Sequence, residues 1–119
     1  MILAKSLNKY LEDEGHKVNV CYSADGALKL LDKANVVDLI IMELLLPANG
    51  GVELIYEIRS YQDLKELPVI VLSFAPFAKA GITRHNMKSL GINAYLYKPA
   101  TSNQDLTLAI DEVLVLANK

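Results

Sequence analysis

The most constraining feature of the sequence is a short, continuously apolar run that ends in an acid. Residues 39–42 (LIIM) lack the alternation of a half-exposed strand, and they are too few to cross a bilayer. They predict a central strand that is covered on both faces. Glu43 follows at once, before a loop that contains Pro47 and Gly51. The carboxylate is therefore expected at the C-terminal edge of a parallel sheet, where open α/β sheets place their sites.

Hydrophobic periodicity predicts alternating helices and strands along the rest of the chain. The first expected helix covers residues 1–14 and is closed by Gly15, and the second is capped by Ser23. Three more are expected at residues 52–60, 82–90 and 102–114. Expected strands cover residues 17–22, 38–43, 69–72 and 94–97. Alternation with short connections predicts an α/β fold, a three-layer α/β/α sandwich around a parallel sheet, in a single domain of residues 1–119.

Composition and charge exclude several classes of function. The 12 basic residues do not exceed the 14 acidic ones, so direct binding of nucleic acid by this chain is not expected. Cys21 is the only cysteine and lies in an apolar run, which favours a buried, inert thiol. The sequence has no signal peptide and no long apolar segment, so we expect a cytoplasmic protein that does not enter a membrane.

Three polar residues end three of the expected strands on the same side. Glu43, Ser73 and Lys98 would place a carboxylate, a hydroxyl and an ammonium at one edge of the sheet. One interpretation is a structural ion pair in which Lys98 neutralises Glu43. A Ser-Lys nucleophile pair is disfavoured, because no oxyanion-hole motif accompanies it. His16 and His85 lack partners at metal-ligand spacing and are expected at the surface, so no metal site is predicted.

The chain resembles the receiver domain of response regulators in two-component signalling, a flavodoxin-like family that accepts a phosphoryl group on an aspartate. Three segments carry the resemblance in the right order: DLIIMELLLPANGG, LPVIVLS and GINAYLYKP. It implies that Glu43 stands in the phosphoacceptor position and that Pro47 and Gly51 belong to the acceptor loop. It also implies that Ser73 and Tyr95 are the switch residues and that Lys98 contacts the phosphoryl group.

Two departures from the family pattern alter the expected function. The acceptor is Glu43 instead of aspartate, and the first strand, with the acidic pair that holds Mg²⁺ in the family, is absent from the sequence. Phosphoryl transfer between anions depends on such a metal, so we expect no cofactor and no enzyme activity. Glutamate is longer than aspartate by about 1.5 Å, so Glu43 could imitate the phosphorylated state and leave Tyr95 largely buried. The alternative is that Glu43 is a structural remnant.

The expected function is therefore that of an atypical receiver, or pseudo-receiver, acting as a protein-interaction module. The alternative is a phosphorylation-competent receiver seen without its first strand. The resemblance implies a histidine kinase or a downstream effector as partner. A missing central strand would leave two apolar strands unpaired, which favours a homodimer that covers the gap, unless the strand at residues 17–22 shifts across to pair with residues 38–43.

Overall fold

The computed structural model describes residues 5–21, 24–32, 37–43, 51–77 and 82–117. In these ranges, a parallel sheet has the order β1-β2-β3, with β1 at Ile40–Met42, β2 at Val69–Ser73 and β3 at Ile92–Tyr97. The helices are α1 (Lys5–Asp13), α2 (Ala24–Asp32), α3 (Gly51–Ser60), α4 (Arg84–Leu90) and α5 (Asn103–Ala117). Short 3-10 turns lie at Gln62–Leu64 and Lys98–Ala100. The α/β fold with helices around a parallel sheet is confirmed.

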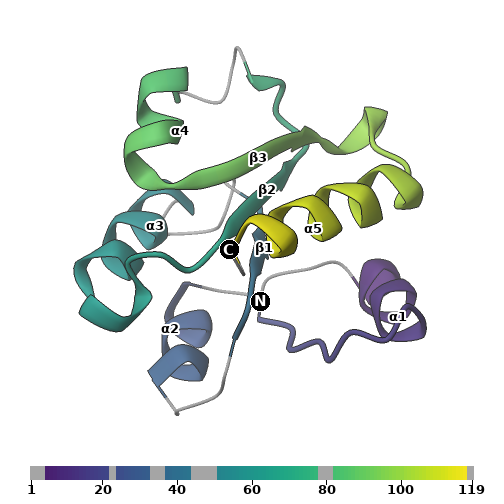
Figure 1. Ribbon diagram of the computed structural model, residues 1–119, viewed down its shortest axis with the longest axis horizontal. Coiled ribbons are helices and arrows are strands. Elements are labelled where there is room, and N and C mark those ends of the chain that lie inside the picture. Colours follow the sequence, from purple (N-terminus) through teal and green to yellow (C-terminus); the bar gives the residue numbers. More distant parts are fainter. Residues whose placement is uncertain (1–4, 22–23, 33–36, 44–50, 78–81, 118–119) are drawn as a thin grey trace.

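The helices cover both faces of the sheet (Figure 1). Side chains alternate along each strand, so β1 sends Ile40 and Met42 toward a cluster with α2, α3 and α4, and Ile41 toward a cluster with α1 and α5. β2 is buried along its whole length, as expected of a strand covered on both faces. The continuous apolar runs of the sequence therefore correspond to the middle layer of the sandwich.

The ends of the helices follow from local sequence signals. Gly15 follows α1 with a φ of 94°, and Gly91 follows α4 with a φ of 69°, both in the left-handed region that glycine tolerates. Thr83 caps α4 by accepting a hydrogen bond from the Asn86 amide at 3.0 Å. At the start of α5, the Asp105 amide donates to Ser102 Oγ and the Ser102 amide donates to Asp105 Oδ2, each at 3.0 Å. The predicted capping box is confirmed.

This capping box makes the carboxyl of Asp105 unusually acidic. The hydrogen bonds from the backbone and side chain of Ser102 lower the pKa of Asp105 below its ordinary value of 3.8. A carboxyl whose pKa is lower in the folded state stabilises the folded chain when the pH is above the pKa of the unfolded state. This stabilisation is lost as the pH falls through the pKa of the folded state. We expect an NMR titration to give a folded-state pKa below 3.8. Ser102→Ala should return it toward that value; an unchanged titration would contradict this assignment.

Arg59 on α3 joins three segments of the chain. Its Nε donates to the carbonyl of Leu90 at 2.8 Å, Nη1 to that of Leu64 at 2.9 Å and Nη2 to that of Gly91 at 3.0 Å. Desolvation by burial lowers the pKa of the guanidinium, which remains charged at neutral pH. This side chain therefore closes the C-terminal end of α4, where carbonyl groups lack helical partners.

Some expected elements differ in the structure. Residues 17–21 form no strand, so the prediction of a strand at 17–22 is wrong over these residues. They also do not pair with β1, as they would if this segment had shifted across to residues 38–43. An extended run gains regular hydrogen bonds only beside a neighbouring strand. The expected helix at residues 82–90 begins two residues later, after the Thr83 cap, and the strand expected at 94–97 begins earlier, at Ile92. Residues 1–4, Tyr22 and Ser23 lie outside the described residues.

Candidate functional site at the C-terminal edge of the sheet

The candidate site lies where the three parallel strands end. Glu43 directly follows β1, Ser73 is the last residue of β2, and Lys98 directly follows β3. Because the strands are parallel and in register, these positions share one edge of the sheet. The structure therefore places the three predicted residues at a common edge, on three neighbouring strand ends.

Glu43 is half-buried, and its carboxylate holds the backbone that follows β2. Its Oε1 accepts a hydrogen bond from the amide of Phe74 at 3.0 Å. A charged acceptor makes this bond stronger than an ordinary amide contact. The carboxylate thus connects the end of one strand to the loop that leaves the next strand.

Ser73 and Tyr95 fix the next residue of the same loop. Ser73 is fully buried, and its Oγ accepts a hydrogen bond from the amide of Ala75 at 3.1 Å. The hydroxyl of Tyr95 donates to the carbonyl of Ala75, and its ring meets that of Phe77 edge to face, with centroids 5.3 Å apart. Tyr95 is turned inward but half-buried, so it is less buried than expected. The backbone at Phe74 and Ala75 is consequently held by three side chains: Glu43, which follows β1, Ser73 of β2 and Tyr95 of β3.

Lys98 contacts an aromatic ring at this edge. Its Nζ lies 4.6 Å from the centroid of the Phe74 ring, within the range of a cation–π interaction. Phe74 itself is 60% exposed. Glu43 and Lys98 therefore both contact Phe74, one through its amide and the other through its ring.

Phe74 is the site residue that the sequence analysis missed. Only one signal was available, a large aromatic directly after the polar end of an apolar strand, and such a residue is more often part of a packed loop. Gly51, predicted as part of the acceptor loop, is buried at the start of α3. Pro47 lies outside the described residues. Cys21 is buried, as expected, whereas His16, expected at the surface, is half-buried.

The described part of this edge offers the carboxylate of Glu43 but no cluster of metal ligands. Mg²⁺ in phosphoryl-transfer sites is held by one or two carboxylates together with phosphate oxygens and waters. No group of three or more His, Cys, Asp or Glu able to hold a metal occurs among the described residues. The described carboxylate here, Glu43, is engaged with the Phe74 amide. The expectation that the chain holds no cofactor stays a prediction.

The same contacts weigh against a Ser-Lys nucleophile pair. Ser73 is fully buried, and its Oγ is occupied as a hydrogen-bond acceptor from Ala75. The ammonium of Lys98 lies over the Phe74 ring. A nucleophile requires both an accessible oxygen and a base within hydrogen-bond reach of it. The arrangement is suited to fixing a loop conformation.

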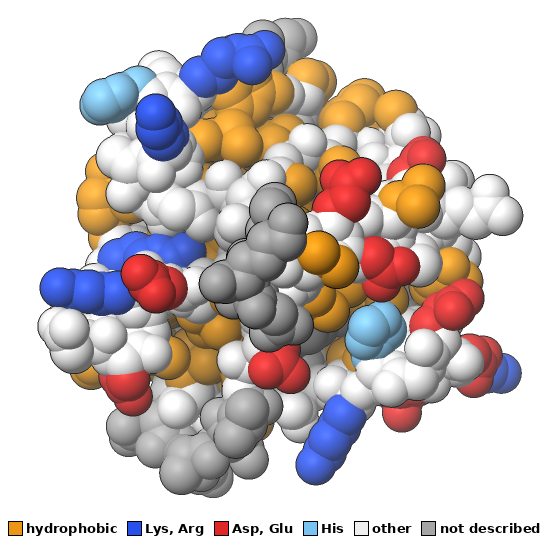
Figure 2. Space-filling model, viewed as in Figure 1, with side chains coloured by type: hydrophobic (Ala, Val, Ile, Leu, Met, Phe, Trp, Pro, Cys, Tyr) orange, Lys and Arg blue, Asp and Glu red, His pale blue; other side chains and the backbone are white. Residues whose placement is uncertain are grey.

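Charge is distributed unevenly over the molecular surface. On the face shown in Figure 2, acidic side chains gather around α5 and basic ones toward α4. The exposed residues Asp105, Asp111 and Glu112 lie on α5, and Arg84 and Lys88 lie on α4.

No helix in the described ranges is long and apolar enough to span a membrane.

Comparison with known proteins gives consistent relatives. A family model described as the response regulator receiver domain matches residues 1–111. A probable transcriptional regulator, ycf29, of Porphyra purpurea is 34% identical over 98 residues, which make up 82% of this chain and 45% of that protein. The chain spans about half the length of such curated relatives.

Solved structures share the fold over almost the whole chain. A sensor protein from Polaromonas sp. JS666 has a TM-score of 0.83 at 26% identity, with 96% of this chain and 88% of that chain covered. A putative response regulator from Chloroflexus aurantiacus has a TM-score of 0.79 at 27% identity, with 93% and 87% covered. Each of these matches covers more than nine-tenths of this chain.

Proposed function

The chain belongs to the response regulator receiver family of two-component signalling, and we propose that it acts there as a pseudo-receiver. In this proposal, Glu43 in the phosphoacceptor position holds the loop after β2 in one conformation without an incoming phosphoryl group. The chain is then a protein-interaction module with no enzyme activity of its own. Its partners are a histidine kinase or a downstream effector in the cytoplasm.

The observation that supports this proposal is the hydrogen bond from the Phe74 amide to Glu43 Oε1 at 3.0 Å. A phosphoryl group in a receiver acts by ordering a loop through negatively charged oxygens. Here a side-chain carboxylate oxygen contacts the loop after β2 directly. Tyr95, bonded to the next residue of that loop, then stays in its inward position.

Phe74 provides a second reason to expect that Glu43 does not accept a phosphoryl group. Its ring lies against the ammonium of Lys98, the group that would otherwise neutralise charge on an incoming phosphoryl oxygen. With Lys98 engaged and no metal-binding cluster among the described residues, little positive charge remains available for transfer. The phosphorylation-competent receiver is the alternative, and it requires additional acidic residues from outside the described ranges.

We expect the chain to be unresponsive to small phosphodonors. After treatment with acetyl phosphate and Mg²⁺, intact mass spectrometry should show the unmodified protein, and hydrogen exchange at the Phe74 amide should be unchanged. A stoichiometric phosphoryl adduct on Glu43 would show that the alternative is right. The homodimer expected from the sequence also stays a prediction, which light scattering of the chain in solution tests.

Glu43→Ala and Glu57→Ala form a matched pair for the role of the carboxylate. Glu57 is an exposed acid on α3, so its replacement controls for the loss of one negative charge. Loss of a hydrogen bond to a charged acceptor, about 1.5 kcal/mol, should speed exchange of the Phe74 amide roughly tenfold in Glu43→Ala only. Equal exchange in both variants would remove the support for a carboxylate-held loop.

A further inference from the structure

A groove of about 490 Å³ opens between α2, α3 and the 3-10 turn at Gln62–Leu64. α2 and α3 lie next to one another on the same face of the sheet (Figure 1). This α2–α3 groove shares no lining residue with the edge that carries Glu43, Ser73 and Lys98. Its role therefore does not depend on whether Glu43 accepts a phosphoryl group.

The floor of the α2–α3 groove is apolar and continuous with the core. Leu28 and Leu31 of α2 and Leu64 of the turn line the groove, and each also packs against the buried cluster beneath it. Tyr61 lines the groove as well and is 48% exposed; tyrosine is enriched at protein interfaces. Arg59 Nη1 holds the carbonyl of Leu64 at 2.9 Å. The floor thus offers a preformed apolar surface, which loses little conformational entropy when a partner binds.

The rim of the α2–α3 groove is acidic. Asp25 of α2, Glu57 of α3 and Asp63 of the turn are exposed, and the one base among the lining residues is Lys29. No ion pair with a described residue neutralises the three carboxylates. The groove therefore combines an apolar floor with an excess of negative charge.

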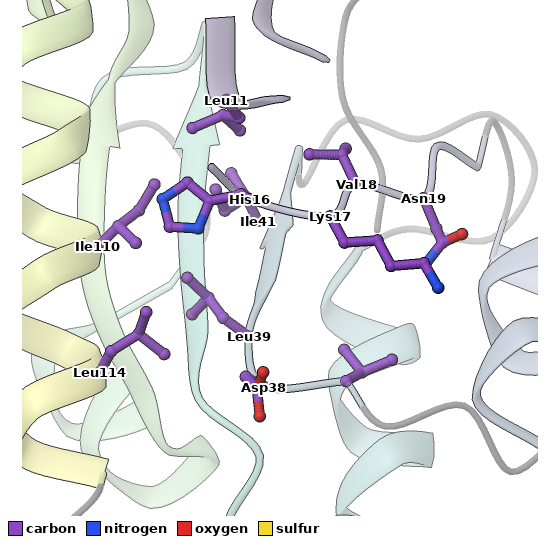
Figure 3. Close-up of a pocket in the computed structure, with 11 residues that line it drawn as sticks. Leu11, His16, Lys17, Val18, Asn19, Asp38, Leu39, Ile41, Ile110 and Leu114 are labelled. Atoms are coloured by element: carbon purple, nitrogen blue, oxygen red, sulfur yellow. The ribbon is translucent and has the colours of Figure 1, made fainter. Parts of the chain in front are cut away.

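A second hollow shows that this charge excess is not a general property of concave surfaces on the molecule. A cavity of about 460 Å³ lies beside β1, with Ile41 of β1 and Ile110 of α5 among its lining residues (Figure 3). It is lined by one acid, Asp38, and one base, Lys17, so its charges balance. The α2–α3 groove, in contrast, favours a cationic partner over a neutral or acidic one.

We propose that the α2–α3 groove binds an amphipathic helix of a partner protein, with apolar side chains on one face and Lys or Arg beside them. Neighbouring helices leave a groove that accepts the side chains of a third helix, and such helices are anchored by apolar residues at i, i+3, i+4 and i+7. The apolar face would cover Leu28, Leu31 and Tyr61. The basic side chains would lie near Asp25 and Glu57.

A second copy of this chain does not offer such a helix in α4, its basic helix. Arg84 and Lys88 are exposed there. The large apolar residues of α4, Met87 and Leu90, pack against the core of their own chain. The charge of α4 fits the rim of the groove, but α4 has no apolar face to cover the floor.

The probe for this proposal is a designed peptide, AKKLAKLLKKLAKK, which as a helix has leucines on one face and lysines on the other. In an NMR titration of the whole chain, it should shift the amides of Leu28, Leu31 and Leu64. The peptide AEELAELLEELAEE has the same leucines with the opposite charge and should bind about tenfold more weakly. Equal affinity for both peptides, or shifts centred on Leu108 and Val115 of α5, would overturn the proposal.

Tyr61→Ala and Tyr56→Ala form a matched pair for the floor. The two tyrosines are 48% and 58% exposed, and Tyr61, but not Tyr56, lines the groove. Tyr61→Ala should weaken binding of the lysine peptide about tenfold, whereas Tyr56→Ala should leave it unchanged. Circular dichroism confirms that both variants are folded, and equal affinities would contradict the assigned floor.

A second pair of variants tests the rim at constant net charge. Changing Asp25 and Glu57 together to lysine should weaken binding about tenfold. Changing Asp111 and Glu112, two exposed acids of α5, should change the affinity by less than about threefold, because salt screens distant charges. Equal losses in the two variants would overturn the proposal. A dimer of the free chain whose α2 and α3 amides shift on dilution would assign the groove to a second copy and also overturn it.

Discussion

Replacing Arg59 with alanine is expected to lower the free energy of unfolding by about 2–4 kcal/mol, the largest effect of any single polar substitution proposed for this chain. The guanidinium donates to the carbonyls of Leu64, Leu90 and Gly91. Alanine would leave those acceptors without their donor, and the hydrogen bonds to Leu64 and Leu90 are partly shielded from water. Urea unfolding measured by circular dichroism gives the difference directly.

Two further variants separate geometry from charge. Arg59→Lys keeps the positive charge but offers a single nitrogen in place of the planar guanidinium. Its free energy of unfolding should therefore fall by more than half of the decrease expected for Arg59→Ala. Lys65→Ala removes an exposed cation from the neighbouring turn and should change the stability by less than about 0.5 kcal/mol. A lysine variant as stable as the natural protein would show that charge alone accounts for the effect.

Replacing Gly91 with alanine is expected to cost about 2–3 kcal/mol, more than its backbone conformation alone explains. A φ of 69° costs an L-residue about 1–2 kcal/mol. A Cβ at this position would also meet Arg59 Nη2 at 3.0 Å. The added methyl group would therefore force the guanidinium to shift by a few tenths of an ångström, which weakens its hydrogen bonds and adds to the backbone strain.

Gly15→Ala is the matched control for this second contribution. Gly15 also follows a helix with a positive φ, but a Cβ there would meet no atom within 4 Å. Gly15→Ala should therefore cost only the backbone strain. In thermal unfolding, the Gly91→Ala variant should melt at a lower temperature than the Gly15→Ala variant. In the double variant with Arg59→Ala, the excess cost of Gly91→Ala should disappear. Equal costs at the two glycines would contradict the proposed contact.

The sequence predicted the features of this fold that depend on neighbouring residues. The continuous apolar runs gave β1 and β2, and the spacing of Ser102 and Asp105 located the start of α5. Parallel strand order then placed Glu43, Ser73 and Lys98 at one edge. These inferences hold because burial and capping are encoded locally.

The features that could not be predicted depend on contacts between distant residues. Nothing local shows that Arg59 reaches the end of α4, about thirty residues away, or that Lys98 meets the ring of Phe74. The run at 17–22 has the composition of a strand, but a strand forms only beside a partner, and the described residues supply none there. The strand propensity of these residues is therefore not sufficient to form a strand without a neighbouring strand.

The hydrogen bond between Tyr10 and Thr107 spans 97 residues of sequence, so we expect it to form late in folding. Closing so long a loop is costly in chain entropy, whereas α3, β2, α4 and β3 follow one another closely and can associate early. α1 precedes α5 in the chain, and the cluster that buries Leu11 contains residues of α5 as well as of the sheet, so this packing is complete only when α5 is in place. We therefore expect α1 to remain an unpacked amphipathic helix until α5 has formed and offers its part of the packing surface.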